Sequence, residues 1–348
     1  MAFAYPSGFN TFVPSFEASG HLVVAFSRNP KDFPLNKWIS LTPVKKSVGY
    51  YLRITPEVAA RVINNDLREF IWTDGDDAPD GNWGTESFSW FPFNTTRYSF
   101  PFRLGYKAEE QADWKILSAH SEFAAQDAMT ARAVRCINKL LDSAQYASSH
   151  VKTATVWGGG FWSAGTSTSP IIKKSLNAMA QQIQLDTLGK VKPSDLNLVI
   201  SPLTADIMAR SAEIHDYAKG SYVVQRVLED GAVNPNQQWG LPPSLYGFPI
   251  VVDDTVQVTT KKGATTTTAY AFGPAATGTA ALVCRKSGLT SVAGGPSFST
   301  IHVFSYEEMT VEQRDDPDNR RIKARVVEDY DVQVVAPATA CLATNVYA

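Results

Sequence analysis

The longest uninterrupted helical pattern in the chain lies in residues 108–147. This stretch contains no proline or glycine, and its apolar residues are spread with many alanines over more than one helical face. Glu109 stands at its start and Lys139 near its end, an order that suits the helix macrodipole. We therefore predict one helix, straight or bent, from Glu109 to about Tyr146. At 1.5 Å per residue it would span about 55 Å, far beyond the usual length in globular domains.

Aromatic residues surround an acidic turn in the segment before this helix. Eleven of the 37 residues from Phe70 to Tyr106 are Phe, Trp or Tyr, and the acidic stretch DGDDAPDGNWG divides them. Aromatic strands on either side of such a tip predict a long β-hairpin over residues 67–106. A two-stranded ribbon cannot cover so many rings, so we expect a neighbouring subunit to cover them. The candidate contact residues are Trp72, Trp83, Phe88, Trp90, Phe91, Phe93, Phe100 and Phe102.

The remaining patterns are shorter. Five prolines among aromatic residues in residues 1–48 predict an extended arm instead of a long helix. Residues 50–54 read as a strand, residues 171–188 as an amphipathic helix that ends at Gly189, and residues 196–200 as a buried strand. From Phe248 onward β-branched residues dominate and predict short strands. The expected order is arm, hairpin, long helix, α/β domain and late strands.

Composition indicates an ordinary globular protein, with 44% apolar and 19% charged residues and a net charge of −2. The charge is unevenly distributed, since residues 1–50 carry a net of +3 and residues 66–90 a net of −6. The three cysteines are far apart and form no C-x-x-C pair, which predicts buried, reduced thiols and assembly in a cytosol. The N-terminus has no signal-peptide pattern, and no uncharged run is suited to a membrane span.

No motif commits the chain to a reaction or a cofactor. The Walker loop, the Rossmann glycine spacing, the H-E-x-x-H helix and the G-x-S-x-G elbow are all missing from the sequence. The acidic tip fits a calcium loop poorly, because Ala78 stands at the third position of the loop and Ser87 stands where a bidentate Glu is needed. Its acids could form a carboxylate pair beside tryptophans, so a carbohydrate-binding or carbohydrate-active protein is the alternative from another functional class. We predict no catalytic residue, no cofactor-binding residue and no metal ligand, and we do not expect the protein to be an enzyme.

Two C-terminal segments carry a family resemblance. Residues 239–252, WGLPPSLYGFPIVV, combine an aromatic residue, glycine, proline and an aliphatic run, and residues 325–332, RVVEDYDV, precede VAPA at residues 335–338. In this order along the chain, they resemble the major capsid proteins of tailed bacteriophages, whose fold also builds encapsulin compartments.

The resemblance implies an α+β capsid fold over essentially the whole chain. Its parts would be an N-terminal arm (1–66), an extended β-hairpin loop (67–107), a peripheral domain with the long spine helix and long strands (108–160 and 296–348), and an α/β axial domain (161–295).

The resemblance also implies a structural role without catalysis. Many copies would form pentamers and hexamers of an icosahedral shell around double-stranded DNA, in a virion assembled in the host cytoplasm. Portal, scaffold and decoration proteins would be further partners, without a membrane. An encapsulin-like compartment shell is the alternative within the same fold. Because packaged DNA is a dense polyanion, we expect an inner surface with basic residues, for which the candidates are Arg28, Lys31, Lys37, Lys45, Lys46, Arg132, Arg135 and Lys139.

Overall fold

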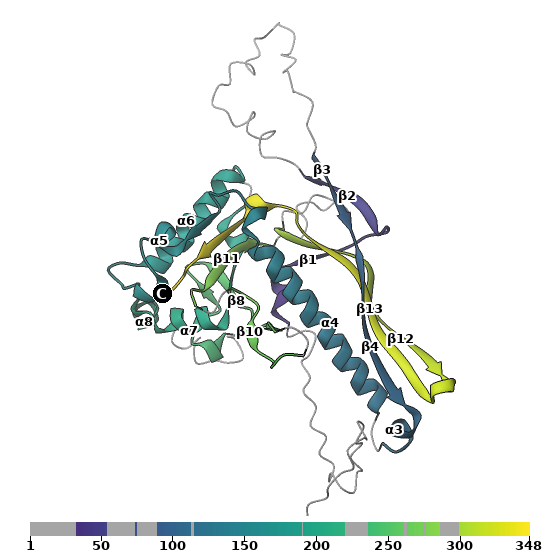
Figure 1. Cartoon of the computed structure of the whole chain (residues 1–348). Coiled ribbons are helices and arrows are strands. Elements are labelled where there is room, and N and C mark those ends of the chain that lie inside the picture. Colours follow the sequence, from purple (N-terminus) through teal and green to yellow (C-terminus); the bar gives the residue numbers. More distant parts are fainter. Residues whose placement is uncertain are drawn as a thin grey trace, which may run out of the picture.

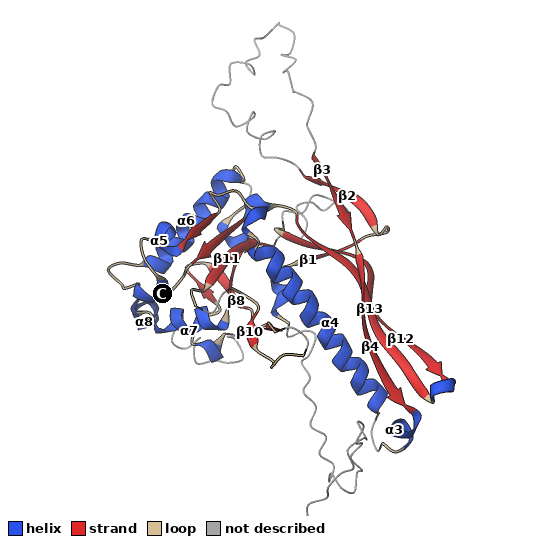
Figure 2. Ribbon diagram, in the orientation of Figure 1, coloured by secondary structure: helices blue, strands red, loops and turns tan. Residues whose placement is uncertain are grey.

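The computed structural model describes residues 33–53, 74, 89–112, 115–189, 191–219, 236–260, 263–273, 276–285 and 299–348. These residues form a four-stranded sheet, a six-stranded sheet, two two-stranded pairs and several helices, and a long helix runs beside the four-stranded sheet (Figures 1 and 2).

The spine helix is shorter than predicted. Helix α4 spans Ile116–Leu141, which is 26 residues and about 39 Å at 1.5 Å per residue. The predicted start at Glu109 falls in a separate short helix, α3 (Tyr106–Glu110). The chain reverses direction between strand β4 (Thr96–Gly105) and α4, and α3 lies at this reversal (Figure 1). At the other end Asp142 leaves the helical conformation, and its side chain accepts a hydrogen bond from the Ala144 amide in the next turn.

Helix α4 lies against a sheet of long strands. The sheet has the order β1-β12-β13-β4, formed by Ser40–Pro43, Ile301–Asp316, Arg321–Val334 and Thr96–Gly105. Strands β12 and β13 form a long antiparallel pair, and β4 continues the pairing along β13 from Arg321 to Tyr330. One sheet face carries residues buried toward α4, such as Ala324 and Val326, while alternate residues of β13 near its start are exposed. This helix and sheet together project from the body of the molecule (Figure 1).

The body contains a six-stranded sheet of order β5-β14-β11-β6-β8-β7. Its strands are Val151–Thr153, Ala340–Thr344, Thr279–Cys284, Leu196–Ile200, Phe248–Val252 and Ser244–Leu245. Strands β5 and β14 therefore belong to this sheet, although the predicted boundaries assign residues 151–160 and 340–348 to the peripheral domain. Outside the sheet, a two-stranded pair of β9 (Val256–Val258) and β10 (Thr268–Tyr270) follows β8.

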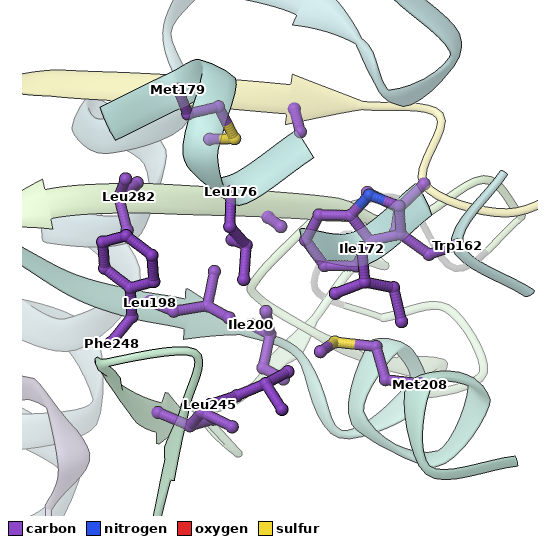
Figure 3. Close-up of a cluster of buried hydrophobic side chains, with 14 of the residues drawn as sticks. Trp162, Ile172, Leu176, Met179, Leu198, Ile200, Met208, Leu245, Phe248 and Leu282 are labelled. Atoms are coloured by element: carbon purple, nitrogen blue, oxygen red, sulfur yellow. The ribbon is translucent and has the colours of Figure 1, made fainter. Parts of the chain in front are cut away.

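Both faces of the six-stranded sheet are buried. Helices α5 (Ala154–Gly158), α6 (Ile171–Asp186), α7 (Pro202–Arg210) and α8 (Ala212–Lys219) contribute to the body. Side chains of α6 and α7 meet those of β6, β8 and β11 in one core, where Leu176, Leu198 and Leu282 lie fully buried (Figure 3). Alternate strand residues, including Val199 and Val283, face a second core that contains the C-terminal half of α4 and Val303 and Val332 of the long sheet. This second core joins the two sheets.

Helix α6 receives its N-terminal cap from a residue distant in sequence. The carboxylate of Glu213 accepts hydrogen bonds from the Ile172 and Lys173 amides, each 2.9 Å long, and a third from the Tyr246 hydroxyl at 2.9 Å. A negative charge at this position satisfies free amides and complements the helix dipole. The loop between α5 and α6 fits closely over this carboxylate, because a Cβ on Gly165 would lie 2.5 Å from Glu213 Oε2.

Residues 33–43, predicted as part of the arm, belong to the folded body. Leu35, Trp38 and Ile39 are buried in the core between the sheets. The Trp38 indole donates a 3.1 Å hydrogen bond to Asp253 Oδ2, just after β8. Strand β1 then pairs in parallel with β12. The described part of the predicted arm is therefore held on its own subunit by packing, by a buried hydrogen bond and by strand pairing.

Candidate assembly surfaces

The predicted hairpin of residues 67–106 is paired differently from the prediction. Strand β3 (Ser89–Asn94) pairs with β2 (Val48–Arg53), in antiparallel register from Val48–Asn94 to Arg53–Ser89. The following strand, β4, pairs with β13. The two strands that enclose the acidic segment are thus β2 and β3, and the ribbon begins at residue 48 instead of 67. The sequence expectation was wrong because β4, rich in aromatic residues, finds its partner in the C-terminal β13.

One face of the β2–β3 ribbon packs against the long sheet. Phe93 is buried and stacks on Phe304 of β12 with ring centroids 4.7 Å apart, and Tyr51 lies between Phe91 and Phe304 at 5.7 and 5.5 Å. A Cβ on Gly49, the residue opposite Phe93, would lie 2.6 Å from the Phe93 ring. The absence of a side chain at Gly49 therefore lets the ring cross the ribbon, and the ribbon is fixed on its own subunit at this end.

The other face of the ribbon is apolar and exposed. Tyr50 is 67% exposed, Trp90 63% and Val48 57%. Tyr50 lies opposite Pro92, and Trp90 is its diagonal neighbour on the same face. Leu41 of β1 is also exposed. Large apolar side chains gathered on one face of a narrow ribbon are typical of a surface that another protein covers.

The predicted contact residues divide into three groups. Trp90 is exposed on this outer face, as the contact prediction requires. Phe91 and Phe93 point toward the long sheet, and Phe100 and Phe102 lie half-buried on the α4 side of β4, where Phe102 stacks on His120 at 6.0 Å. Trp72, Trp83 and Phe88 lie outside the described residues. Tyr50 was not among the candidates, because its role depends on a pairing that the sequence pattern did not show.

The predicted DNA-facing residues are also divided. Lys37, Lys45 and Lys46 are exposed, Lys139 is partly exposed, and Arg28 and Lys31 lie outside the described residues. Arg132 and Arg135 have partners inside the subunit. The Arg135 guanidinium lies 3.6 Å above the Tyr98 ring and donates a hydrogen bond to the Tyr330 hydroxyl. We therefore keep the DNA-facing prediction only for the lysines and Arg28.

Arg132 and Glu328 form a buried ion pair between α4 and β13. The Arg132 Nη1 atom lies 3.4 Å from Glu328 Oε2, and Glu328 is only 1% exposed. Neither carboxylate oxygen has a hydrogen-bond donor among the described residues. Burial raises the pKa of Glu328 above its ordinary value, while Arg132 and Arg135 act in the opposite direction. At the contact between the spine helix and the long sheet, the Glu328 carboxylate is thus buried beside a cation but has no hydrogen-bond donor among the described residues.

A cysteine, a histidine and an aspartate meet at the start of β5, but the group has no activated nucleophile. His150 Nε2 lies 2.5 Å from Asp186 Oδ2, and its Nδ1 donates to the Ala340 carbonyl at 2.7 Å and lies 3.2 Å from Cys341 Sγ. Cys341 is fully buried, and burial raises the pKa of its thiol. Because the thiolate is the nucleophile, this environment opposes nucleophilic chemistry. The contacts join α6, β5 and β14 as a structural link.

All three cysteines are free and buried, as predicted. In the described part of the chain, no three His, Cys, Asp or Glu side chains gather as a metal ion would require. Within the same residues, no helix has the length and apolar character needed to cross a membrane.

Comparison with known proteins supports the fold. No family model matches the sequence, and no curated protein is significantly similar to it. Solved structures are similar despite low identity. A phage-related protein from Bordetella bronchiseptica is 15% identical, with a TM-score of 0.61 over 92% of this chain and 94% of that protein. The mature capsid subunit of bacteriophage PhiM1 is 14% identical, with a TM-score of 0.54 over 93% and 90%.

An encapsulin shows the same similarity. The SrpI encapsulin from Synechococcus elongatus is 10% identical, with a TM-score of 0.51 over 97% of this chain and 96% of that protein. In each case the similarity extends over nearly the full length of both chains, so it includes the spine helix, the long sheet and the six-stranded sheet together. The chain therefore has the fold that phage capsid proteins and encapsulins share.

Proposed function

We propose that this protein is the structural subunit of an icosahedral phage capsid that encloses double-stranded DNA. The observation that carries the proposal is the full-length similarity to phage capsid structures, with TM-scores of 0.54 and 0.56. Pentamers and hexamers would form around the axial domain, residues 161–295. The protein would be part of the virion and assemble in the host cytoplasm, where its buried free cysteines remain reduced.

The ribbon supplies the physical reason for assembly. Its inner face is packed on its own long sheet, while Tyr50, Trp90 and Val48 present apolar area to solvent. Full burial of one large side chain contributes about 2–3 kcal/mol, so a few such residues per subunit favour association in a many-copy lattice. We propose that the outer face of the ribbon and the segment it carries lie over a neighbouring subunit.

The inner surface would carry the predicted basic residues other than Arg132 and Arg135. Lys37, Lys45, Lys46 and Lys139, together with Arg28 and Lys31, would face the packaged polyanion without sequence preference. Portal, scaffold and decoration proteins are the further partners of this proposal. No catalytic role is assigned to any residue, and the proposed activity is assembly itself.

An encapsulin-like compartment is the second candidate function. The observation that favours it is the similarity to the SrpI encapsulin, which covers 97% of this chain. The two functions share the shell and differ in its content. In this alternative the shell would hold a protein cargo instead of a genome.

Analysis of the shell content tests the proposal. Particles containing this subunit are purified from their natural source, treated with nuclease and opened. A capsid is expected to release nuclease-protected double-stranded DNA. Particles with a protein cargo and no protected DNA would establish the compartment instead, and a subunit that never sediments as a particle would contradict both.

A further inference from the structure

A buried histidine lies where β1, the long sheet and the β2–β3 ribbon come together. His302 is the second residue of β12, opposite Ser40 of β1 and Gln333 of β13. Its ring stacks on that of Phe304 with the centroids 6.1 Å apart, and Phe304 stacks in turn on Phe93 of the ribbon at 4.7 Å. A continuous stack of rings therefore joins His302 to the ribbon.

The His302 side chain is hydrogen-bonded at one of its two ring nitrogens. The residue is 6% exposed. Its Nδ1 atom lies 2.9 Å from the Thr42 hydroxyl of β1, a group that can donate or accept. The buried Nε2 atom has no hydrogen-bond partner among the described residues. Because a neutral imidazole has one donor and one acceptor nitrogen, the Thr42 contact suits the neutral ring in either tautomer.

A second proton on this ring would have no acceptor. In the imidazolium both nitrogens are donors, so Nδ1 would donate to Thr42 while the Nε2 proton would point into a buried site without a partner. A buried charge that is not paired is costly, and the cost favours exposure of the ring to water. Burial accordingly lowers the pKa of His302 from its ordinary value of 6.5, although the Ser299 backbone acts in the opposite direction.

The carboxylate diagonal to His302 on this sheet face is engaged elsewhere. Asp331 of β13 lies opposite Phe304, and its Oδ2 atom accepts hydrogen bonds from the Asn94 amide at 3.1 Å and the Gln333 side chain at 2.8 Å. Among the described residues, the histidine that forms an ion pair is His150. Asp331 therefore fastens the end of the ribbon to β13 and does not pair with the His302 ring.

The other elements around the ring offer it no counter-charge. The ribbon contributes the aromatic rings of Phe93 and Tyr51 at this position. On β1, the residues beside His302 and Phe304 are Ser40 and Thr42, which are uncharged. The remaining charged groups nearby in the chain are paired with one another or exposed: Glu307 and Asp329 beside Arg97, and Lys45 and Lys46 after β1.

We propose that His302 is an acid-sensitive latch, which holds β1 and the ribbon on the long sheet while its ring is neutral and releases them when the ring is protonated. The two elements are the ones that meet the ring or its stack, β1 through Thr42 and the ribbon through Phe93 on Phe304. The latch belongs to the single subunit, so it does not depend on the proposed function.

The direction of the response follows from proton linkage. Burial lowers the pKa of His302 in the closed state, so the released state binds more protons between that pKa and 6.5. Release is therefore favoured as pH falls through this window and disfavoured above 6.5. Since the outer face of the ribbon carries exposed Trp90 and Tyr50, the latch makes the orientation of this apolar face depend on pH.

Hydrogen exchange of the full-length chain tests the latch. Wild type, His302→Gln and the exposed control His215→Gln are labelled at about pH 7.5 and about pH 5, on either side of 6.5, with times scaled to the intrinsic exchange rate. At the lower pH, wild type and the control should lose about tenfold protection in peptides of β1, β2 and β3 and keep it in β6. His302→Gln cannot take up the proton and should keep its protection in all of them.

Each other pattern of exchange would overturn the latch. Wild-type β1 and ribbon peptides that are equally protected at both pH values would show that no release occurs. The same acid-induced loss in His302→Gln would assign the response to another group, because every other ionisable side chain is common to the three proteins. Loss of protection in β6 together with the ribbon would show general acid unfolding instead of a local release.

A titration of the wild-type ring gives a second test that does not depend on the folding of His302→Gln. Nitrogen-15 labelled histidines are followed by NMR, and Thr42→Val identifies the His302 signals because it removes the hydrogen bond at Nδ1. The His302 ring should stay neutral to below 6.5, and its protonation should coincide with the loss of ribbon protection. A ring that titrates at or above 6.5 would overturn the proposal.

Discussion

At the scale of single residues, buried polar contacts hold together segments that are distant in sequence. Trp38 and Asp253 are both fully buried and are 215 positions apart. Their hydrogen bond fixes the start of the described chain to the end of β8. Glu213 similarly caps α6 from another helix. Such contacts have no local sequence signature, and therefore residues 33–43 were predicted as an arm.

Replacing Trp38 tests the contribution of its indole N–H. Trp38→Phe removes the donor and leaves Asp253 Oδ2 without it, which should lower the free energy of unfolding by about 1–3 kcal/mol. Chemical denaturation of the variant measures the change. Asp253→Asn and the double variant complete a cycle, and strict additivity of the two single effects would contradict a direct contact.

Glu328 should make stability depend on pH. Burial raises the pKa of its carboxyl above the ordinary value of 4.5 in the folded state. The folded state thus holds the proton more tightly, and the free energy of unfolding falls as pH rises from 4.5 through the folded pKa. Glu328→Gln cannot titrate, so its stability relative to wild type should improve as pH rises through that window. Glu308→Gln, an exposed control, should show no such change in denaturation series.

At the scale of elements, the sequence pattern predicted correctly the helix and the strand whose boundaries are set by their own residues. The strand at residues 196–200 and the helix of residues 171–188 are confirmed as β6 and α6. The spine helix was predicted about ten residues too long, because a run without proline or glycine permits a helix but does not require one. The ribbon was paired incorrectly because both aromatic strands have partners outside the predicted hairpin, at Val48–Arg53 and Arg321–Tyr330.

A proline within α4 should disrupt the packing of this helix on the long sheet. Ala125→Pro removes an internal hydrogen bond in the middle of Ile116–Leu141 and should cost about 3 kcal/mol or more. We expect loss of particles together with a lowered unfolding midpoint. Ala125→Gly, which costs only about 1 kcal/mol, serves as the graded control. Normal particles from the proline variant would contradict the view that a continuous α4 is needed to support the long sheet.

The two faces of the β2–β3 ribbon should respond oppositely to truncation. Phe93→Ala empties the stack on Phe304 and should cost about 3–5 kcal/mol of subunit stability. Trp90→Ala removes an exposed ring and should change subunit stability by less than about 0.5 kcal/mol, yet reduce particle formation. Thermal unfolding and sedimentation of both variants separate the two effects. A large loss of subunit stability for Trp90→Ala would contradict an intersubunit role.

At the scale of the whole molecule, the chain combines a double-sided core with surfaces that remain incomplete. Among the described residues, the six-stranded sheet is covered on both faces, whereas the outer part of one face of the long sheet and one face of the ribbon are exposed. Sequence reasoning predicted that the aromatic segment contributes contacts, and Trp90 lies where that requires. It missed the basic residues that β13 and its neighbouring strands place side by side, although the alternation of Arg321, Lys323 and Arg325 is visible in the sequence. The position of Arg103 and Arg314 beside them depends on strand register.

Electron microscopy of the purified protein tests the assembly function most directly. The subunit is concentrated at near-physiological salt, applied to grids and imaged with the Trp90→Ala variant beside it. We predict closed icosahedral shells built from pentamers and hexamers for the wild type, and few or none for the variant. A wild-type protein that stays monomeric at every concentration, with saturable glycan binding, would contradict a shell subunit and support a carbohydrate-binding protein.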